Sequence, residues 1–133
     1  MAKTLNLKVV TPNGPVVEKD VESFTARSTE GEFCVLPGHA LLLTSIAAGR
    51  MIVKADEKDQ TYALDTGFLE AGPEHIHVIT DHCQAAGDVD ADSVKEEIAE
   101  IEKQLRDDEL DSAVREELKR KLGWAEARLG VAG

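Results

Sequence analysis

The sequence changes character at Gly87, and this change constrains the fold more than any other feature. Up to Gly87, apolar and polar residues alternate in short segments separated by turn residues, a pattern typical of half-buried β-strands. Beyond it, apolar residues recur about every 3.6 positions and proline is absent, which is typical of amphipathic helices. We therefore predict a β domain over residues 1–87 and a helical domain over residues 88–133.

The first part predicts an antiparallel β-sandwich or barrel. Its strands are short and follow one another at intervals of about 8–12 residues between turn signals, which favours this architecture over a parallel sheet. Residues 5–11 form the first expected strand. In the expected strand at residues 21–27, we predict that Phe24 and Ala26 point inward. Aromatic residues make up only 4% of the chain, so the core must be aliphatic.

The second part predicts an antiparallel αα-hairpin. A first helix over about residues 91–106 carries the apolar stripe Val94, Ile98, Ile101 and Leu105. The acidic segment 107–111 interrupts the pattern and caps a second helix. The apolar stripe of that helix consists of Val114, Leu118, Leu122, Ala125 and Leu129. Because the connection is short, the helices must run antiparallel, and we expect the two stripes to pack on each other.

We also expect the hairpin to be marginally stable and detachable from the β domain. Each helix has only one stripe to bury, and Gly123 inside the second helix costs about 1 kcal/mol relative to alanine.

Charge and composition exclude several classes of partner. The formal net charge of −11 argues against nucleic acid or an anionic membrane surface as the main partner. No apolar run approaches the ~18 residues of a membrane span, so we expect no direct insertion into lipid. The first residues lack a signal-peptide pattern, which predicts a cytosolic protein. We expect Cys34 and Cys83 to be free thiols.

Four residues, His75, His77, His82 and Cys83, are the plausible metal ligands in the sequence. A zinc site needs three or four ligands converging at about 2.0–2.3 Å, but the side chains of adjacent residues diverge in an extended chain. We therefore predict an exposed strand face at His75 and His77, without a metal or another cofactor. The sequence has no glycine-rich phosphate loop and no nucleophile elbow, so we predict no active site.

A turn at Pro37-Gly38 lies within the most distinctive stretch of the chain. Glu-Gly-Glu-Phe at residues 30–33 is followed by Val-Leu-Pro-Gly-His-Ala at 35–40 and Leu-Leu-Thr at 42–44. This stretch resembles the signature of the epsilon subunit of F-type ATP synthases. The resemblance continues through Gly-Phe-Leu-Glu at 67–70 and Val-Ile-Thr-Asp at 78–81, and it covers nearly the whole chain in order.

The resemblance implies a β-sandwich of about ten strands followed by an αα-hairpin. It also implies a non-catalytic rotor subunit, in which the sandwich binds the gamma subunit and rests on the c-ring. Such a subunit couples the catalytic head to the c-ring. It lies peripherally at the cytoplasmic face of the plasma membrane as part of the complex.

The family's ring-facing loop corresponds to six residues of this sequence: Glu30, Gly31, Glu32, Pro37, Gly38 and His39. Among these, Glu32 and His39 are the best candidates for contacting polar loops of the c-ring. The alternative is that Gly31, Pro37 and Gly38 only shape the turns.

The family's hairpin can also restrain ATP hydrolysis, through basic residues that meet an acidic loop of the catalytic beta subunit. The corresponding basic residues here are Arg115, Lys119, Arg120, Lys121 and Arg128. The alternative is a solvated helix face, because Glu116 and Glu117 are placed to pair with Arg120 and Lys121 at i,i+4.

Some epsilon subunits bind ATP through Ile/Leu-Asp-x-x-Arg-Ala at the start of the first helix. This chain keeps Asp90, but Ser93 stands in place of the arginine and Val94 in place of the alanine. A serine cannot supply the charge-assisted contacts that a guanidinium makes with phosphate. We expect ATP binding to be weak or absent.

Two other classes of protein stay open at this point. An acidic adaptor that docks a partner helix on its hairpin would explain the composition and the stripes, although not the signature at residues 30–44. A small metal-dependent β-sandwich enzyme would rest only on the histidine cluster.

Overall fold

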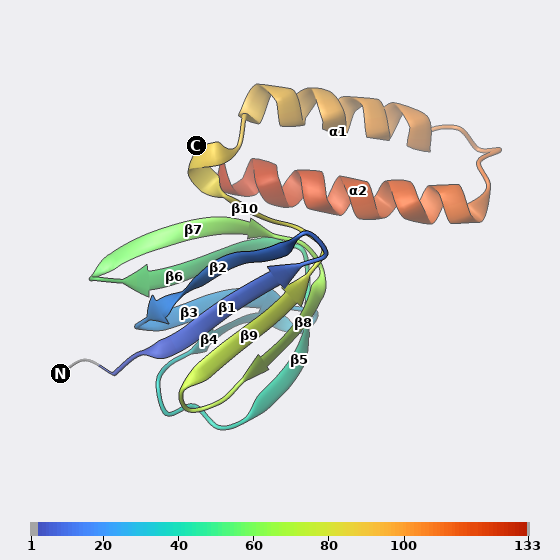
Figure 1. Cartoon of the computed structure of the whole chain (residues 1–133). Coiled ribbons are helices and arrows are strands. Elements are labelled where there is room, and N and C mark those ends of the chain that lie inside the picture. Colours follow the sequence, from blue (N-terminus) through green and yellow to red (C-terminus); the bar gives the residue numbers. More distant parts are fainter. Residues whose placement is uncertain (1–2, 133) are drawn as a thin grey trace.

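The computed structural model describes residues 3–132, with ten strands followed by helices (Figure 1). The strands are β1 (Leu5–Thr11), β2 (Gly14–Val21), β3 (Ser23–Ser28), β4 (Gly31–Val35), β5 (Leu42–Ile46), β6 (Gly49–Ala55), β7 (Lys58–Leu64), β8 (Gly67–Ala71), β9 (His75–Thr80) and β10 (Cys83–Ala85). A short 3₁₀ turn, η1 (Ala86–Asp88), leads to α1 (Ala91–Leu105) and α2 (Ser112–Val131).

The strands form one continuous sheet that folds over on itself into a sandwich. Its order is β10-β7-β6-β3-β5-β8-β9-β1-β2, and β4 pairs with β3. The predicted antiparallel sandwich with two C-terminal helices is confirmed, apart from one pairing. Strand β1 runs parallel to β9, with Leu7 beside Ile76. The two strands lie far apart in the sequence, so no hairpin turn dictates their relative direction.

The core lies between the two layers of the sandwich and is aliphatic apart from Phe24. Strand β1 shows the alternation that the sequence predicts, since Leu5, Leu7 and Val9 are fully buried. Phe24 and Ala26 both point inward, as predicted, with at most 1% of their surface exposed. The sixteen buried residues of this cluster all come from the strands.

Both helices begin at aspartate caps, in agreement with the sequence. The carboxylate of Asp90 accepts a hydrogen bond from the backbone N–H of Ser93, and that of Asp111 accepts one from Ala113. These bonds satisfy backbone donors that have no partner inside the helix. No helix among residues 3–132 combines the length and apolarity needed to cross a bilayer.

Helix α2 packs on two neighbours, which corrects the expectation that each helix has a single stripe to bury. It lies between α1 and strands β6 and β7 (Figure 1). Leu118 and Ala125 of the predicted stripe are buried, and so is Ala127, which lies outside that stripe. Val114, in the first turn of α2, is 47% exposed although it belongs to the predicted stripe.

Candidate interaction surfaces

The Pro37-Gly38-His39 turn is fastened to the β8–β9 turn. The backbone N–H of Gly38 donates to the carbonyl of Pro73 at 2.8 Å, and Gly38 adopts a φ of 88°, which favours glycine. His39 donates from Nδ1 to the carbonyl of Ala40 at 2.6 Å. Both turns lie at the end of the sandwich farthest from the helices (Figure 1). Pro37, Gly38 and His39 therefore form one hydrogen-bonded turn at this end of the sandwich.

Glu30, Gly31 and Glu32 lie at the other end of β4. The Ser28 hydroxyl holds this turn by donating to the carbonyl of Gly31 at 3.0 Å. Glu32 accepts a hydrogen bond from Arg50 at 3.3 Å, with both side chains exposed. Strand β4 begins at Gly31 and its five residues span roughly 16 Å, which places Glu30 and Gly31 at the opposite end of the strand from Pro37. The structure does not gather the six predicted c-ring residues into a single patch.

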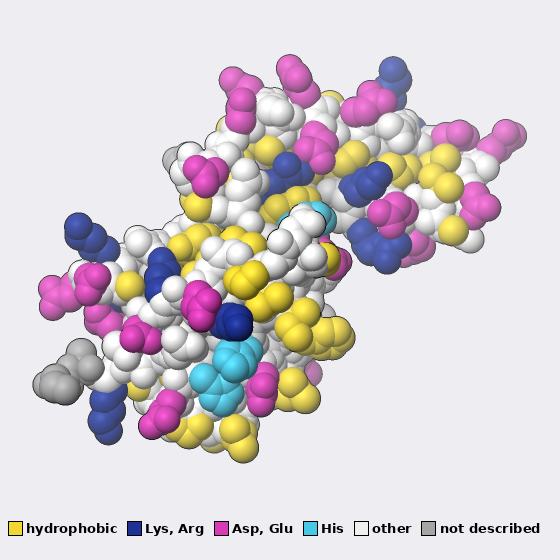
Figure 2. Space-filling model, in the orientation of Figure 1, with side chains coloured by type: hydrophobic (Ala, Val, Ile, Leu, Met, Phe, Trp, Pro, Cys, Tyr) yellow, Lys and Arg dark blue, Asp and Glu magenta, His cyan; other side chains and the backbone are white. Residues whose placement is uncertain are grey.

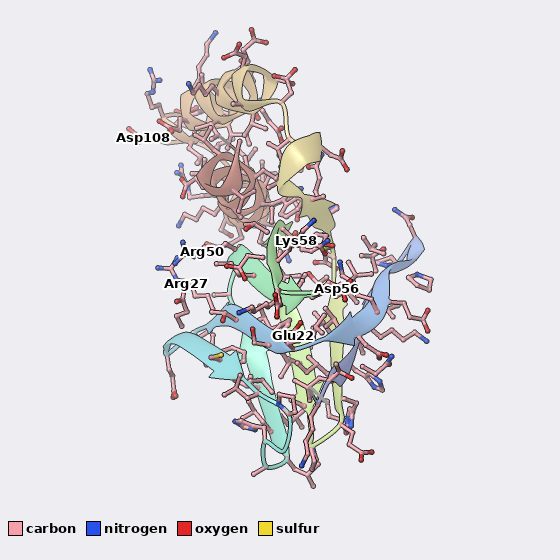
Figure 3. The ribbon with its side chains drawn as sticks, turned by 90° about the vertical axis from the view of Figure 1, so that its left-hand side faces the viewer. Glu22, Arg27, Arg50, Asp56, Lys58 and Asp108 are labelled. Atoms are coloured by element: carbon pink, nitrogen blue, oxygen red, sulfur yellow. The ribbon has the colours of Figure 1, made fainter. Side chains whose placement is uncertain are left out.

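A hollow of about 560 Å³ lies between this side of the sandwich and α2. Figure 3 shows Arg27 and Arg50 on the side of the sandwich that lies beneath the helices. The sandwich lines the hollow with Arg27, Glu32 and Arg50, and α2 lines it with Gly123, Ala127 and Val131. Glu32 therefore lies beside the hairpin rather than near His39.

An apolar face on the outside of β5, β8 and β9 was missed by the sequence analysis. It consists of Leu41, Leu43, Phe68 and Ile79, whose exposed fractions are 77, 78, 64 and 66%. Phe68 and Ile79 are cross-strand partners. A hollow of about 640 Å³ borders both residues. In Figure 2, hydrophobic side chains gather on this part of the sandwich beside histidines.

Exposed apolar clusters of this kind mark interaction surfaces in soluble proteins. The sequence does contain a signal for this apolar face, namely two pairs of consecutive apolar residues, Phe68-Leu69 and Val78-Ile79. Two neighbours on a strand point to opposite faces, so such a pair implies that both faces are apolar.

The five basic residues of the second helix differ in how they are engaged. Arg115 donates to the carbonyls of Leu105 and Asp107 at 3.0 and 2.7 Å and so closes the turn between the helices. Arg128, which is 15% exposed, pairs with Glu97 of α1 at 2.8 Å. Both arginines hold the hairpin together.

Lys119, Arg120 and Lys121 are exposed on the hairpin surface. Lys119 pairs with Glu116 at 3.6 Å and Arg120 with Glu117 at 2.6 Å. These pairs are spaced i,i+3 rather than the predicted i,i+4. Both spacings bring side chains together on a helix, and here the shorter one is used.

His82 joins the sandwich to the hairpin. Its Nδ1 lies 2.8 Å from Oδ2 of the buried Asp65, and its ring stacks on Trp124 of α2 with centroids 5.2 Å apart. The guanidinium of Arg128 lies 5.2 Å from the centroid of the same indole ring. This cluster, which we call the junction, fastens α2 to the end of β9. His82 is thus directed to Asp65 and Trp124, away from His75 and His77.

The other sequence-predicted residues are placed as follows. Cys83 lies half-buried in β10, where burial raises its thiol pKa to about 11. Cys34 and Cys83 are both free, as predicted. The Asp90 carboxylate caps the N-terminus of α1.

Comparison with known proteins identifies the family. The sequence model described as "ATP synthase, Delta/Epsilon chain, beta-sandwich domain" matches residues 4–86, more than half of the chain. The chain belongs to this family. An ATP synthase epsilon chain of Bacillus pumilus is 31% identical over 131 residues, covering 98% of each chain. The epsilon chain of Anoxybacillus flavithermus is 34% identical over 104 residues, covering 78% of each.

Two solved structures support the fold of this epsilon-family chain. A chain of the Euglena gracilis mitochondrial ATP synthase, from a complex of OSCP, F1 and c-ring, superposes with a TM-score of 0.79 at 21% identity. That match covers 93% of this chain and 78% of the other. A chain of the Tetrahymena thermophila central stalk and c-ring superposes with a TM-score of 0.58 at 11% identity, with full coverage of both.

Family membership gives this chain its general role. It is a non-catalytic subunit of the ATP synthase, an epsilon chain.

Proposed function

We propose that this subunit couples the catalytic head to the c-ring by docking the apolar face of its sandwich on the gamma subunit. The exposure of Leu41, Leu43, Phe68 and Ile79 carries the proposal. Their removal from water would favour binding by about 25 cal/mol per Å² of apolar surface. As part of the complex, the subunit would lie peripherally at the cytoplasmic face of the plasma membrane.

The turn at Pro37, Gly38 and His39 is the proposed main contact with the c-ring. Its hydrogen bond to Pro73 holds it in place, and it lies at the end of the sandwich opposite the helices. Glu30, Gly31 and Glu32 form a separate candidate contact, because β4 lies between the two segments.

The hairpin over residues 88–133 is the proposed regulatory unit, which restrains hydrolysis by contacting the catalytic beta subunit. Lys119, Arg120 and Lys121 are available for this contact in the observed arrangement. Their ion pairs are exposed and individually worth about 0–1 kcal/mol, so exchange for intersubunit pairs costs little. Arg115 and Arg128 could take part only after their contacts within the hairpin open.

Binding of the purified full chain to purified gamma subunit tests the docking face. Replacing Phe68 and Ile79 together by glutamate should weaken binding at least about thirtyfold, the effect of losing one interface hot spot. The matched control is Val114→Glu, an exposed apolar residue on the hairpin, which should leave affinity unchanged. The opposite pattern, with Val114→Glu disruptive and the double variant neutral, would favour a hairpin-docking adaptor.

The regulatory proposal has its own test in the assembled enzyme. Charge reversal of Lys119, Arg120 and Lys121 to glutamate should raise ATP hydrolysis if these residues restrain the catalytic head. Reversal of Lys58, at the sandwich hairpin tip, serves as the control for a general charge effect. Unchanged hydrolysis in the triple variant would leave the hairpin as a structural clamp.

A further inference from the structure

Three side chains that can bind a metal ion meet on the outer face of β8 and β9. Glu70 on β8 lies directly opposite His77 on β9, and His75 precedes His77 by two residues on the same face. One ligand atom from each lies within 4.8 Å of the other two. This set differs from the four residues considered in the sequence, because Glu70 is brought in only by strand pairing.

The distances are close to those of a bound ion. The ring centroids of His75 and His77 are 4.9 Å apart, and Nε2 of His75 lies 3.9 Å from Oε1 of Glu70. Ligand atoms held tetrahedrally around Zn²⁺ at about 2.0–2.2 Å lie roughly 3.4 Å from one another. Because Glu70 and His77 are exposed and His75 is partly exposed, small side-chain rotations can close the remaining gap.

The β8–β9 turn holds the backbone of His75 and leaves room for its ring. The N–H of Gly72 donates to the carbonyl of His75 at 2.9 Å. A Cβ atom at position 72 would lie only 2.8 Å from Cε1 of the His75 ring. In the observed rotamer, the ring therefore occupies space that a side chain at position 72 would share with it.

The surrounding charges are mixed. The carboxylate of Glu70 supplies a negative charge directly to the site. Lys8 lies beside His77 on β1 and opposes a cation, but Glu18 lies opposite Lys8 on β2. The chain as a whole carries a net charge of −11, which attracts cations.

We propose that Glu70, His75 and His77 bind a divalent transition-metal ion, Zn²⁺ foremost, with water completing the coordination. Two imidazole nitrogens and one carboxylate suit Zn²⁺ or Ni²⁺, whereas Ca²⁺ and Mg²⁺ prefer oxygen ligands throughout. The ion would link β8 to β9 beside Leu43, which lies opposite Glu70 at the edge of the apolar face. The proposal is independent of gamma docking, since all three ligands belong to this chain.

Calorimetric titration of the tag-free full chain with Zn²⁺ tests the site. A Cys34→Ser background removes the exposed thiol as a competing ligand. We expect one ion per chain. His77→Ala and Glu70→Gln should each lower affinity at least about tenfold, since even outer-shell partners contribute about 10–100-fold. Gly72→Ala should weaken binding by displacing the His75 ring.

His39→Ala is the matched control and should leave affinity unchanged, because its ring is bonded to Ala40 at a separate turn. Nuclear magnetic resonance with Co²⁺ gives a second readout that does not depend on folding differences between variants. Ring protons of His75 and His77 should shift strongly, and those of His39 and His82 should not. Absence of saturable binding, or equal affinity in the parent and His77→Ala, would overturn the proposal.

Discussion

The sandwich and the hairpin of this subunit bury their apolar residues in different ways. The sandwich encloses sixteen buried residues in one cluster, which the strands supply from every part of residues 5–78. The hairpin buries only Val94, Ile101, Leu118, Ala125 and Ala127, none of which belongs to that cluster. The junction at His82 and Trp124 connects the two parts. We therefore predict that the hairpin, called the arm below, is held less firmly than the sandwich, called the body.

Truncating a buried side chain in each part should distinguish the stability of the sandwich from that of the hairpin most clearly. Phe24→Ala should destabilise the sandwich by about 3–5 kcal/mol, because Phe24 is fully buried in its core. Leu118→Ala should cost about 2–3 kcal/mol and loosen only the hairpin, where Leu118 packs. Amide hydrogen exchange resolves both regions. Equal loss of protection in both regions for Leu118→Ala would show that the arm and the body unfold as one unit.

Removal of the junction should release the hairpin without harming the sandwich. Trp124→Ala eliminates the stacking on His82 and the contact with Arg128. Since Trp124 is only half-buried, we expect a loss of about 2–3 kcal/mol, below the ~3–5 kcal/mol of a fully buried tryptophan. The hydrogen-exchange rates of the backbone amides in α1 and α2 measure this loss of stability. The exposed Val114→Ala on the same helix should change stability by less than about 0.5 kcal/mol.

Gly123→Ala should strengthen the arm by about 0.5–1 kcal/mol. Nothing lies within 4 Å of a Cβ at position 123, so the substitution gains helix propensity without a clash. Gly67→Ala is the opposing control, because its methyl group would overlap the carbonyl of Ile79. Denaturant unfolding checks both variants. A destabilised Gly123→Ala would mean that α2 approaches the sandwich more closely in solution.

The smallest expected effect concerns the cysteines. At pH 8, iodoacetamide should label the exposed Cys34 and spare Cys83, whose pKa burial raises to about 11. From pH 9 to 11 the unfolded chain loses the Cys83 proton while the folded chain keeps it, so stability falls as pH rises. Cys83→Ala should reduce that slope. Rapid labelling of Cys83 would indicate that β10 and the junction open readily.

Much of the fold and part of the candidate site could be predicted from the sequence. The alternation of inward- and outward-facing residues along the strand predicted that Phe24 and Ala26 face the core. The 3.6-residue period of apolar residues, together with the aspartate caps, predicted both helices. The predicted turn at Pro37-Gly38 is present. These features are local, because a residue's backbone conformation and its immediate neighbours determine them.

The sequence by itself determined the two-part architecture, the helix starts, the aliphatic core and the family. Only the tertiary structure decided that β1 pairs in parallel with β9, that α2 lies between α1 and the sheet, and that Glu70 joins His75 and His77. It also decided that His82 stacks on Trp124 instead of joining the other histidines. Periodicity records which face of a segment is buried, but it does not identify the partner. The partner depends on how distant segments close around one shared core.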